Sequence, residues 1–204
     1  MKKVLIVLFF SISGLLLIGQ SDPLYVKTIA QHRKTYLAAF KTNPSSPLDK
    51  KALKSVQFFP ADERYFVPCQ FSFTPDAVPF DLPTYSGVTR PYVQYGIAKF
   101  KLDGVEHQLS IYRSLSNTLP QYRDHLFVPF KDLSNGESTY GGGRYLDLRI
   151  KDIVDSEFMF DFNKAYNPYC AYSDGYACPI PPDENHLQVS ILVGEKQFSG
   201  EKKK

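Results

Sequence analysis

The sequence predicts a mainly β domain (α+β overall), an antiparallel β-sandwich or small barrel with one or two N-terminal helices. Short segments that alternate apolar and polar residues recur from residue 58 onward, separated by turn sequences. Such spacing is typical of sandwiches and barrels. Residues 22–55 instead carry apolar side chains at helical spacing. Because strands and helices do not alternate, the pattern disfavours a doubly wound nucleotide-binding sheet.

The first 21 residues have the three parts of a secretory signal peptide. A basic start precedes the uncharged apolar run 4–18, and small residues follow at Gly19 and Ser21. The apolar run is shorter than the roughly 20 residues that a membrane span needs. We therefore expect residues 1–21 to be removed on export, which leaves a periplasmic or secreted protein. The alternative is a protein anchored in the membrane by this N-terminus.

Residues 22–44 are predicted to form the N-terminal helix. Asp22 suits its cap and Pro23 its first turn, where a missing backbone N–H costs little. Four apolar side chains then share one face: Tyr25, Ile29, Tyr36 and Phe40. A second, shorter helix is expected over 46–55, with Ser46 as its cap.

Residues 45–198 are predicted to form a single β-rich domain. Asp103-Gly104 lies between two alternating runs and indicates a hairpin, since both residues tolerate positive φ. The expected strands are 65–73, 92–102, 105–112, 126–130, 144–150, 158–162 and 187–193.

Charge excludes one class of partner. The full chain has a formal net charge of +3, but five of its lysines lie in the signal segment or in the tail 199–204, which we expect to be disordered. The domain itself is near neutral and lacks the concentrated positive stripe that nucleic-acid binding requires. We expect no nucleic-acid partner, and no membrane contact after signal cleavage.

Arg144 shares a predicted strand face with Leu146 and Leu148, a face that otherwise is apolar. A buried guanidinium needs a carboxylate partner or a bound anion, because an unpaired buried charge is costly. Asp161 is the candidate partner for a structural pair. The functional alternative is an arginine that clamps the carboxylate or phosphate of a ligand. Asp147 is expected on the opposite, solvated face.

Cys170 and Cys178 flank a turn sequence, and in an oxidising compartment this spacing favours a disulfide. One alternative is a zinc site formed by Cys170, Cys178 and His186, with Glu184 or Asp161 as a fourth ligand. This alternative lacks the Cys-x-x-Cys hook that makes zinc motifs specific. The other alternative is a pair of free thiols. No cofactor is predicted, and zinc is the alternative.

Common catalytic motifs are absent from the sequence. The glycine run 141–143 lacks the Lys-Ser/Thr of a phosphate loop, and neither Gly-x-Ser-x-Gly nor His-Glu-x-x-His occurs. The sequence therefore shows no local signature of an ordinary hydrolase, while a triad assembled from distant residues stays open.

Two long segments, STYGGGRYLDL and DFNKAYNPYCAYSDGYACPIPPDENHLQVSILVGEK, resemble the signature of an uncharacterised bacterial family, the DUF1684 group. SPLDKKALKSVQFFPADERY is similar to the N-terminal stretch of that family, so the resemblance covers about residues 45–198. It implies no activity, since none is established for the family. Some members lack an export signal, and in a reducing compartment the cysteine pair would favour a metal or redox role more than it does here, which weakens the disulfide interpretation without replacing it. The resemblance singles out Gly143, Arg144, Asp161, Asn163, Asn167, Cys170, Cys178, Pro182, Glu184 and Asn185.

The leading functional hypothesis is an exported, non-catalytic binding domain. Its polar corner would be formed by Arg144 and the loop 161–186, with Asn163, Asn167 and Asn185 as further ligand-binding residues. This corner would hold a small anionic ligand or a partner protein, whose identity the sequence does not indicate.

Two further hypotheses stay open. The protein would be a hydrolase with Glu184 or Asp161 as general base, with or without a metal. Alternatively, the corner only closes the sheet, and replacing Arg144 costs stability alone. Four tyrosines of the loop would line a sugar-binding surface or fill a core: Tyr166, Tyr169, Tyr172 and Tyr176.

Overall fold

The computed structural model describes residues 21–117 and 119–203. The predicted signal peptide, residues 1–21, lies outside this range except for Ser21. Within the described range, no helix has both the length and the hydrophobicity that a membrane crossing requires.

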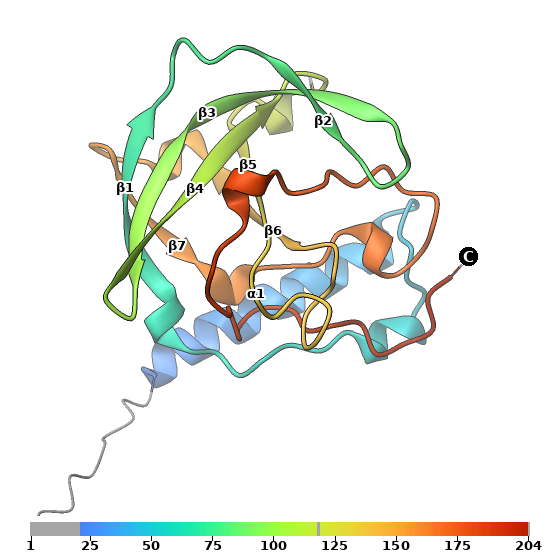
Figure 1. Ribbon diagram of the computed structural model, residues 1–204. Helices are drawn as coiled ribbons and strands as arrows, with labels where there is room; N and C mark the ends of the chain where they lie inside the picture. Colours follow the sequence, from blue (N-terminus) through green and yellow to red (C-terminus); the bar gives the residue numbers. More distant parts are fainter. Residues whose placement is uncertain (1–20, 118, 204) are drawn as a thin grey trace, which may run out of the picture.

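A seven-stranded antiparallel sheet curls into a half-barrel (Figure 1). Its path runs β6-β5-β4-β3-β1-β7, and β2 pairs with β3 beside this path. The prediction of a mainly β, α+β fold with an antiparallel sheet and an N-terminal helix is confirmed. The strands are β1 (Phe66–Phe73), β2 (Phe80–Pro83), β3 (Thr89–Leu102), β4 (Val105–Ser114), β5 (His125–Phe130), β6 (Arg144–Arg149) and β7 (Glu157–Asp161).

The hairpin between β3 and β4 turns at Asp103 and Gly104, which have φ values of 48° and 80°. Both residues therefore occupy the left-handed region that such a turn needs. The two strands pair in register from Leu102↔Val105 to Tyr92↔Ser114, with a bulge between Gln94 and Gly96.

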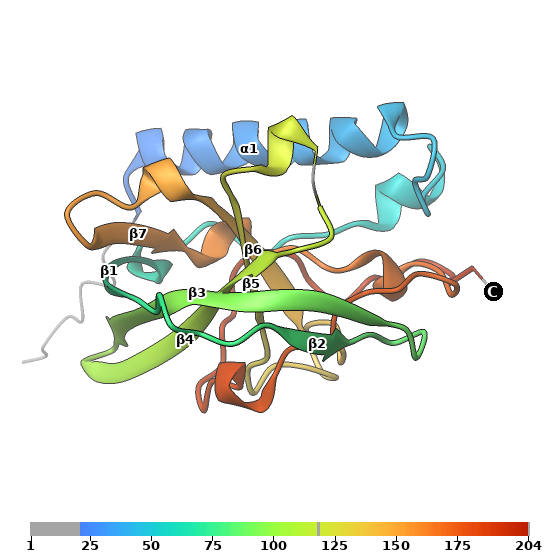
Figure 2. The ribbon, with the colours of Figure 1, turned by 90° about the horizontal axis from the view of Figure 1, so that it is seen from above.

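The helix α1 (Pro23–Thr42) forms a layer beside the sheet, along β7 and the chain that follows it (Figures 1 and 2). The Asp22 carboxylate caps it by accepting a hydrogen bond from the N–H of Leu24 at 2.7 Å. The Tyr25 hydroxyl donates to Asp161 at 2.8 Å, which ties the first turn of the helix to the end of β7. Short 3₁₀ turns complete the structure: η1 (Ala52–Ser55), η2 (Glu63–Tyr65), η3 (Pro120–Tyr122), η4 (Ile150–Asp152), η5 (Phe162–Lys164), η6 (Tyr169–Ala171) and η7 (Asp183–Asn185).

Both faces of β5 and β6 are covered. Alternate residues such as Leu126 and Leu146 enter the main core inside the half-barrel. Their neighbours Phe127 and Tyr145 point the other way and pack with Leu82 of β2 in a smaller apolar cluster. The outer face of these strands therefore forms a second packed surface, which matters for the site below.

The predicted strand 187–193 is wrong as a strand, although its burial pattern is right. Leu187, Ile191 and Val193 are buried in the main core. The segment joins none of the strands of the sheet. The carbonyl groups of Ile191 and Val193 instead accept hydrogen bonds from the guanidinium of Arg144, while that of Val189 accepts from the backbone N–H of Leu133.

Two other predictions change in the structure. The expected helix over 46–55 is only the single 3₁₀ turn η1, because Asp49 rather than Ser46 caps the chain at the N–H groups of Lys51 and Ala52. The expected disordered tail is docked as far as Lys203. The backbone N–H of Lys203 donates to Tyr172, and its carbonyl accepts from Asp174.

Candidate functional site

Arg144 lies in the interior and not at a ligand site. Its side chain is completely buried and pairs with the equally buried Asp132, with 2.9 Å between Nη2 and Oδ2. The guanidinium also donates to the carbonyl oxygens of Ile191, Val193 and Glu195. The predicted burial of Arg144 is therefore confirmed, whereas the predicted partner, Asp161, is wrong.

Asp161 connects the end of β7 to α1. Its carboxylate accepts from the Tyr25 hydroxyl and the N–H of Asn163, and pairs with Lys164 at 3.2 Å. Glu184 lies elsewhere, exposed in η7, where it accepts a 2.7 Å hydrogen bond from the Tyr112 hydroxyl. The two predicted general bases thus belong to different parts of the molecule.

The three predicted ligand-binding asparagines bind three different segments of the chain. Asn163 donates to the carbonyl of Asp62, and Asn185 donates to the carbonyls of Ser110 and Pro129. Asn167 donates to the carbonyl of Lys196 at 2.8 Å. All three are almost fully buried, so these amides have a structural role and satisfy backbone carbonyl groups. The structure does not bring them together with Arg144 into one corner.

Cys170 and Cys178 are placed at disulfide distance, with their Cα atoms 6.2 Å apart. Both are buried, and Cys170 belongs to η6. His186 is separate from them and bonds to the carbonyl of Pro181 at 3.1 Å through its Nε2. Among the residues that the structure describes, no group of three His, Cys, Asp or Glu side chains is arranged to hold a metal ion.

A cleft of about 750 Å³ lies between α1 and the outer face of β5 and β6. Nine of the twenty described residues that line it are aromatic, and we call it the tyrosine cleft. Its aromatic residues are Tyr36, Phe40, Tyr92, Tyr122, Phe127, Tyr145, Tyr166, Tyr169 and Tyr176. Several of these rings pack edge to face, as Phe127 and Tyr145 do with centroids 4.7 Å apart, and others are tilted against one another.

A polar cluster interrupts this aromatic wall. His125 of β5 and Asp147 of β6 project from the outer face, and their Nε2 and Oδ1 atoms are 2.9 Å apart. The hydroxyl of Tyr166 donates to the same carboxylate, at 3.0 Å from each oxygen. Burial and the negative charge of Asp147 raise the pKa of Tyr166, which stays a protonated donor at neutral pH. Asp147 is therefore a half-exposed carboxylate held from two sides, and not the freely solvated group that the strand pattern predicts.

Basic side chains stand at the other walls of the tyrosine cleft: Arg90 on β3, Lys164 in η5 and His32 on α1. Burial and the nearby charge of Lys164 lower the pKa of His32, which is therefore neutral at pH 7. Counting Arg90 and Lys164 against Asp147, 2 − 1 = +1, so the cleft is weakly positive.

A buried carboxylate lies behind the cleft. Glu195 is completely buried and accepts hydrogen bonds from the hydroxyls of Tyr36 and Tyr172 and from the N–H of Asn167 at 3.0 Å. Burial raises the pKa of Glu195 to about 7. Because Tyr36 belongs to α1, this hydrogen-bond network anchors the helix, which forms one wall of the cleft, to Glu195 in the interior.

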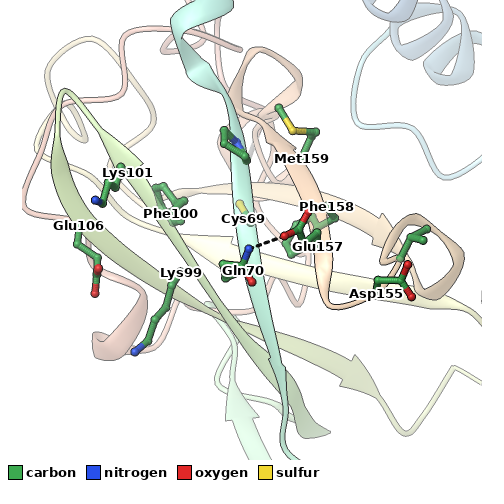
Figure 3. Close-up of a pocket in the computed structure, with 12 residues that line it drawn as sticks. Cys69, Gln70, Lys99, Phe100, Lys101, Glu106, Asp155, Glu157, Phe158 and Met159 are labelled. Carbon is green, nitrogen blue, oxygen red and sulfur yellow. Dashed lines mark hydrogen bonds between the residues drawn. The ribbon is translucent and has the colours of Figure 1, made fainter.

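A second groove lies at the edge formed by β1, β3 and β7 (Figure 3). Gln70 donates to Glu157 at 2.8 Å, while the amino group of Lys99 points away from that pair. Burial raises the pKa of the Cys69 thiol to about 12, so the thiol is unreactive. The polar side chains of this groove bond to one another or face solvent, and they do not converge on a common point.

The sequence does not predict that the polar residues of the tyrosine cleft lie close together. His125, Asp147, Lys164 and Arg90 lie on four different elements, and no local spacing relates them. The useful signal is the tyrosine content of residues 166–176, which in the sequence fits either a binding surface or a core. Tyr172 is buried under α1, whereas Tyr166, Tyr169 and Tyr176 line the cleft.

Comparisons with known proteins give a solved structure of similar fold and a family model. The chain is 30% identical to the uncharacterized protein from gene locus rrnAC0354 of Haloarcula marismortui, whose solution NMR structure it matches with a TM-score of 0.66. The match covers 84% of this chain and 94% of the other. No curated protein of similar sequence is found. The model of the family described as "Protein of unknown function (DUF1684)" matches residues 51–196, and the chain therefore belongs to this family.

Proposed function

We propose that this protein binds a small molecule with an aromatic ring and an anionic group in the tyrosine cleft. The observation that carries the proposal is the composition of the cleft, in which nine aromatic residues surround a weakly positive interior. Ligand sites are typically concave and apolar, with a few convergent polar groups, and their volumes run from roughly 300 to 1,000 Å³. The tyrosine cleft, at about 750 Å³, has this character.

The aromatic part of the proposal follows from the side chains that offer ring faces and edges. Tyr145 and Tyr166 form an edge-to-face pair with centroids 5.8 Å apart. Both rings line the cleft. A planar ligand can stack on or abut such rings, and each aromatic contact contributes roughly 0.5–1.5 kcal/mol beyond the apolar area that it buries.

The anionic part follows from Arg90 and Lys164. Arg90 makes no ion pair within the described part of the chain, and its guanidinium is free to take a carboxylate through two parallel hydrogen bonds. Lys164 is 41% exposed and shares its charge with Asp161. Arg90 is therefore the main candidate for the anion, and Lys164 adds to the positive field.

A titration with 3-acetamidobenzoate tests this function directly. Its ring, carboxylate and amide fit the chemistry of the tyrosine cleft. With 13 non-hydrogen atoms at roughly 0.3 kcal/mol each, a Kd of about 1 mM or tighter is expected by calorimetry. Two matched ligands separate the two contributions. The neutral 3-acetamidobenzamide lacks the charge, and 3-acetamidocyclohexanecarboxylate lacks the aromatic ring, so both should bind at least about fivefold more weakly.

Two substitutions test whether 3-acetamidobenzoate binds in the cleft. Arg90→Gln and Tyr145→Leu should each weaken the binding of 3-acetamidobenzoate by about tenfold, or 1.4 kcal/mol. Lys99→Gln is the control, because Lys99 is also an exposed cation of β3 but lies in the groove at β1, β3 and β7. Binding that Lys99→Gln weakens as much as Arg90→Gln does would contradict the proposal.

We also propose that the protein acts outside the cytoplasm. The basic, apolar and small-residue parts of residues 1–21 support export, as do two cysteines held at disulfide distance. Protein recovered from its own cells should therefore begin near residue 22 and weigh two hydrogens less than its reduced form. A full-length chain in the membrane fraction would indicate the anchored alternative, and a cytoplasmic chain with free thiols would refute export.

A further inference from the structure

We propose that the tyrosine cleft is also a catalytic site, in which His125 activates water to hydrolyse aryl esters that carry an anionic group. The inference rests on the proposed binding function, which places the ester in the cleft. In the cluster formed by His125, Asp147 and Tyr166, only one nitrogen of the imidazole makes a hydrogen bond to a described residue.

The hydrogen bonds determine which nitrogen of His125 is free. An ionised carboxylate only accepts hydrogen bonds, so Nε2 of His125 carries the proton that it donates to Asp147 at 2.9 Å. The other nitrogen, Nδ1, is then an unprotonated acceptor, and it makes no hydrogen bond within the described residues. The side chain of His125 is 20% exposed and lines the cleft, so water and a ligand can reach the ring.

Asp147 is itself held in position. The Tyr166 hydroxyl lies 3.0 Å from both carboxylate oxygens, and β5 and β6 are joined along the whole ladder from His125↔Arg149 to Phe130↔Arg144. The Tyr122 ring meets the imidazole edge to face, with centroids 6.0 Å apart. A base oriented by a carboxylate, which is oriented by a third group, is the arrangement that general-base catalysis requires.

Water is the nucleophile that this cleft can provide. Among the described residues that line it there is no serine or threonine, and its cysteine, Cys178, lies at disulfide distance from Cys170. As the water oxygen bonds to the ester carbonyl carbon, a water proton passes to Nδ1 of His125. Arg90 holds the carboxylate of the ester, and Lys164 supplies positive charge in the same cleft for the carbonyl oxygen that becomes negative.

The second half of the reaction returns the proton. The bond between the acyl carbon and the phenol oxygen breaks, and the imidazolium of His125 protonates the departing oxygen. One ester and one water thus give one carboxylic acid and one phenol, with His125 restored and no other reactant consumed.

Hydrolysis of 3-acetoxybenzoate tests the inference, with the release of 3-hydroxybenzoate as the measurement. His125→Gln should lower kcat by about 100-fold or more, which is the contribution typical of a general base. Its KM and its Kd for the stable amide 3-acetamidobenzoate should stay within about threefold of wild type. Asp147→Asn, a change of a positioning residue, should lower kcat by at least about tenfold with the same Kd.

His107→Gln is the matched control. His107 lies on β4 against Phe100 and outside the cleft, so this variant should keep the wild-type kcat. Wild-type protein that binds the amide but hydrolyses the ester no faster than His125→Gln overturns catalysis and leaves the binding function standing. Failure to bind the amide overturns the binding function itself, and with it this inference.

Discussion

Glu195→Gln should remove a pH-dependent part of the stability of the fold. Burial raises the pKa of Glu195 from its ordinary value of 4.5 to about 7. Between these two values the folded protein binds a proton that the unfolded chain does not. The free energy of unfolding must therefore decrease as pH rises through this window.

The magnitude follows from the two values. At roughly 1.4 kcal/mol per pH unit, the interval between 4.5 and about 7 corresponds to about 3 kcal/mol. This contribution is fully present below pH 4.5 and is lost above pH 7. A glutamine does not titrate, so the variant lacks it at every pH.

The substitution keeps the hydrogen bonds of the site. The amide oxygen can accept from the N–H of Asn167 and the hydroxyl of Tyr36, as one oxygen of Glu195 does. The amide nitrogen can donate to the hydroxyl of Tyr172, which lies 3.1 Å from that of Tyr36 and can donate to it in turn. We therefore expect a folded variant that differs from wild type mainly in its charge.

Urea unfolding of both proteins from pH 4.5 to 8 measures the effect. The free energy of unfolding of Glu195→Gln minus that of wild type should rise by about 3 kcal/mol over this range. All other titrating groups cancel in this difference. Glu106→Gln, a change at an exposed position, should give a flat difference. A flat difference for Glu195→Gln as well would refute the reasoning.

Three further changes test the packing around the site. Arg144→Met should cost about 3–5 kcal/mol in urea unfolding, because it leaves the carboxylate of Asp132 buried without a partner; adding Asp132→Asn should recover part of this loss, and strictly additive losses would argue against the pair. The double change of Cys170 and Cys178 to serine should lower stability by about 2.5 kcal/mol in the chain-entropy account; equal melting temperatures for the variant and the oxidised wild type would exclude a bond between them. Gly194→Ala should cost about 2 kcal/mol or more, since φ is +75° and the new Cβ would lie 2.7 Å from a carbonyl oxygen; a melting temperature unchanged by this substitution would contradict the local geometry.

Local sequence patterns predicted the elements whose structure depends on neighbouring residues. The hairpin at Asp103 and Gly104 follows from the φ that these residues tolerate. The burial of Arg144 follows from the strand face that it shares with Leu146. In both cases the deciding information lies within a few residues of the chain.

Such local patterns do not identify contacts between residues that lie far apart in the sequence. The sequence points to Asp161 as the partner of Arg144, but the path of the chain brings Asp132 to the guanidinium. The segment 187–193 shows why alternation of apolar residues is not sufficient for a strand. Alternation reports burial, while a strand also needs a neighbouring strand, and here the guanidinium of Arg144 binds the carbonyls of Ile191 and Val193 instead.

The tyrosine cleft could be predicted only in part for the same reason. The loop 166–176 is rich in tyrosine, a visible signal, but His125 and Asp147 reach the cleft through the pairing of β5 with β6. Asp147 alternates with buried residues and was expected to face solvent. It faces the cleft instead, because α1 and the loop cover the outer side of the sheet.

The most direct test of the central claim is an NMR titration with 3-acetamidobenzoate on protein whose tyrosine rings are labelled with carbon-13. If the tyrosine cleft is the binding site, the ring signals of Tyr92, Tyr145 and Tyr166 should shift with a common Kd, while those of Tyr65 and Tyr95, which lie outside the cleft, should stay in place. Unshifted cleft signals at saturating ligand, or shifts concentrated at Tyr65 and Tyr95, would contradict the account.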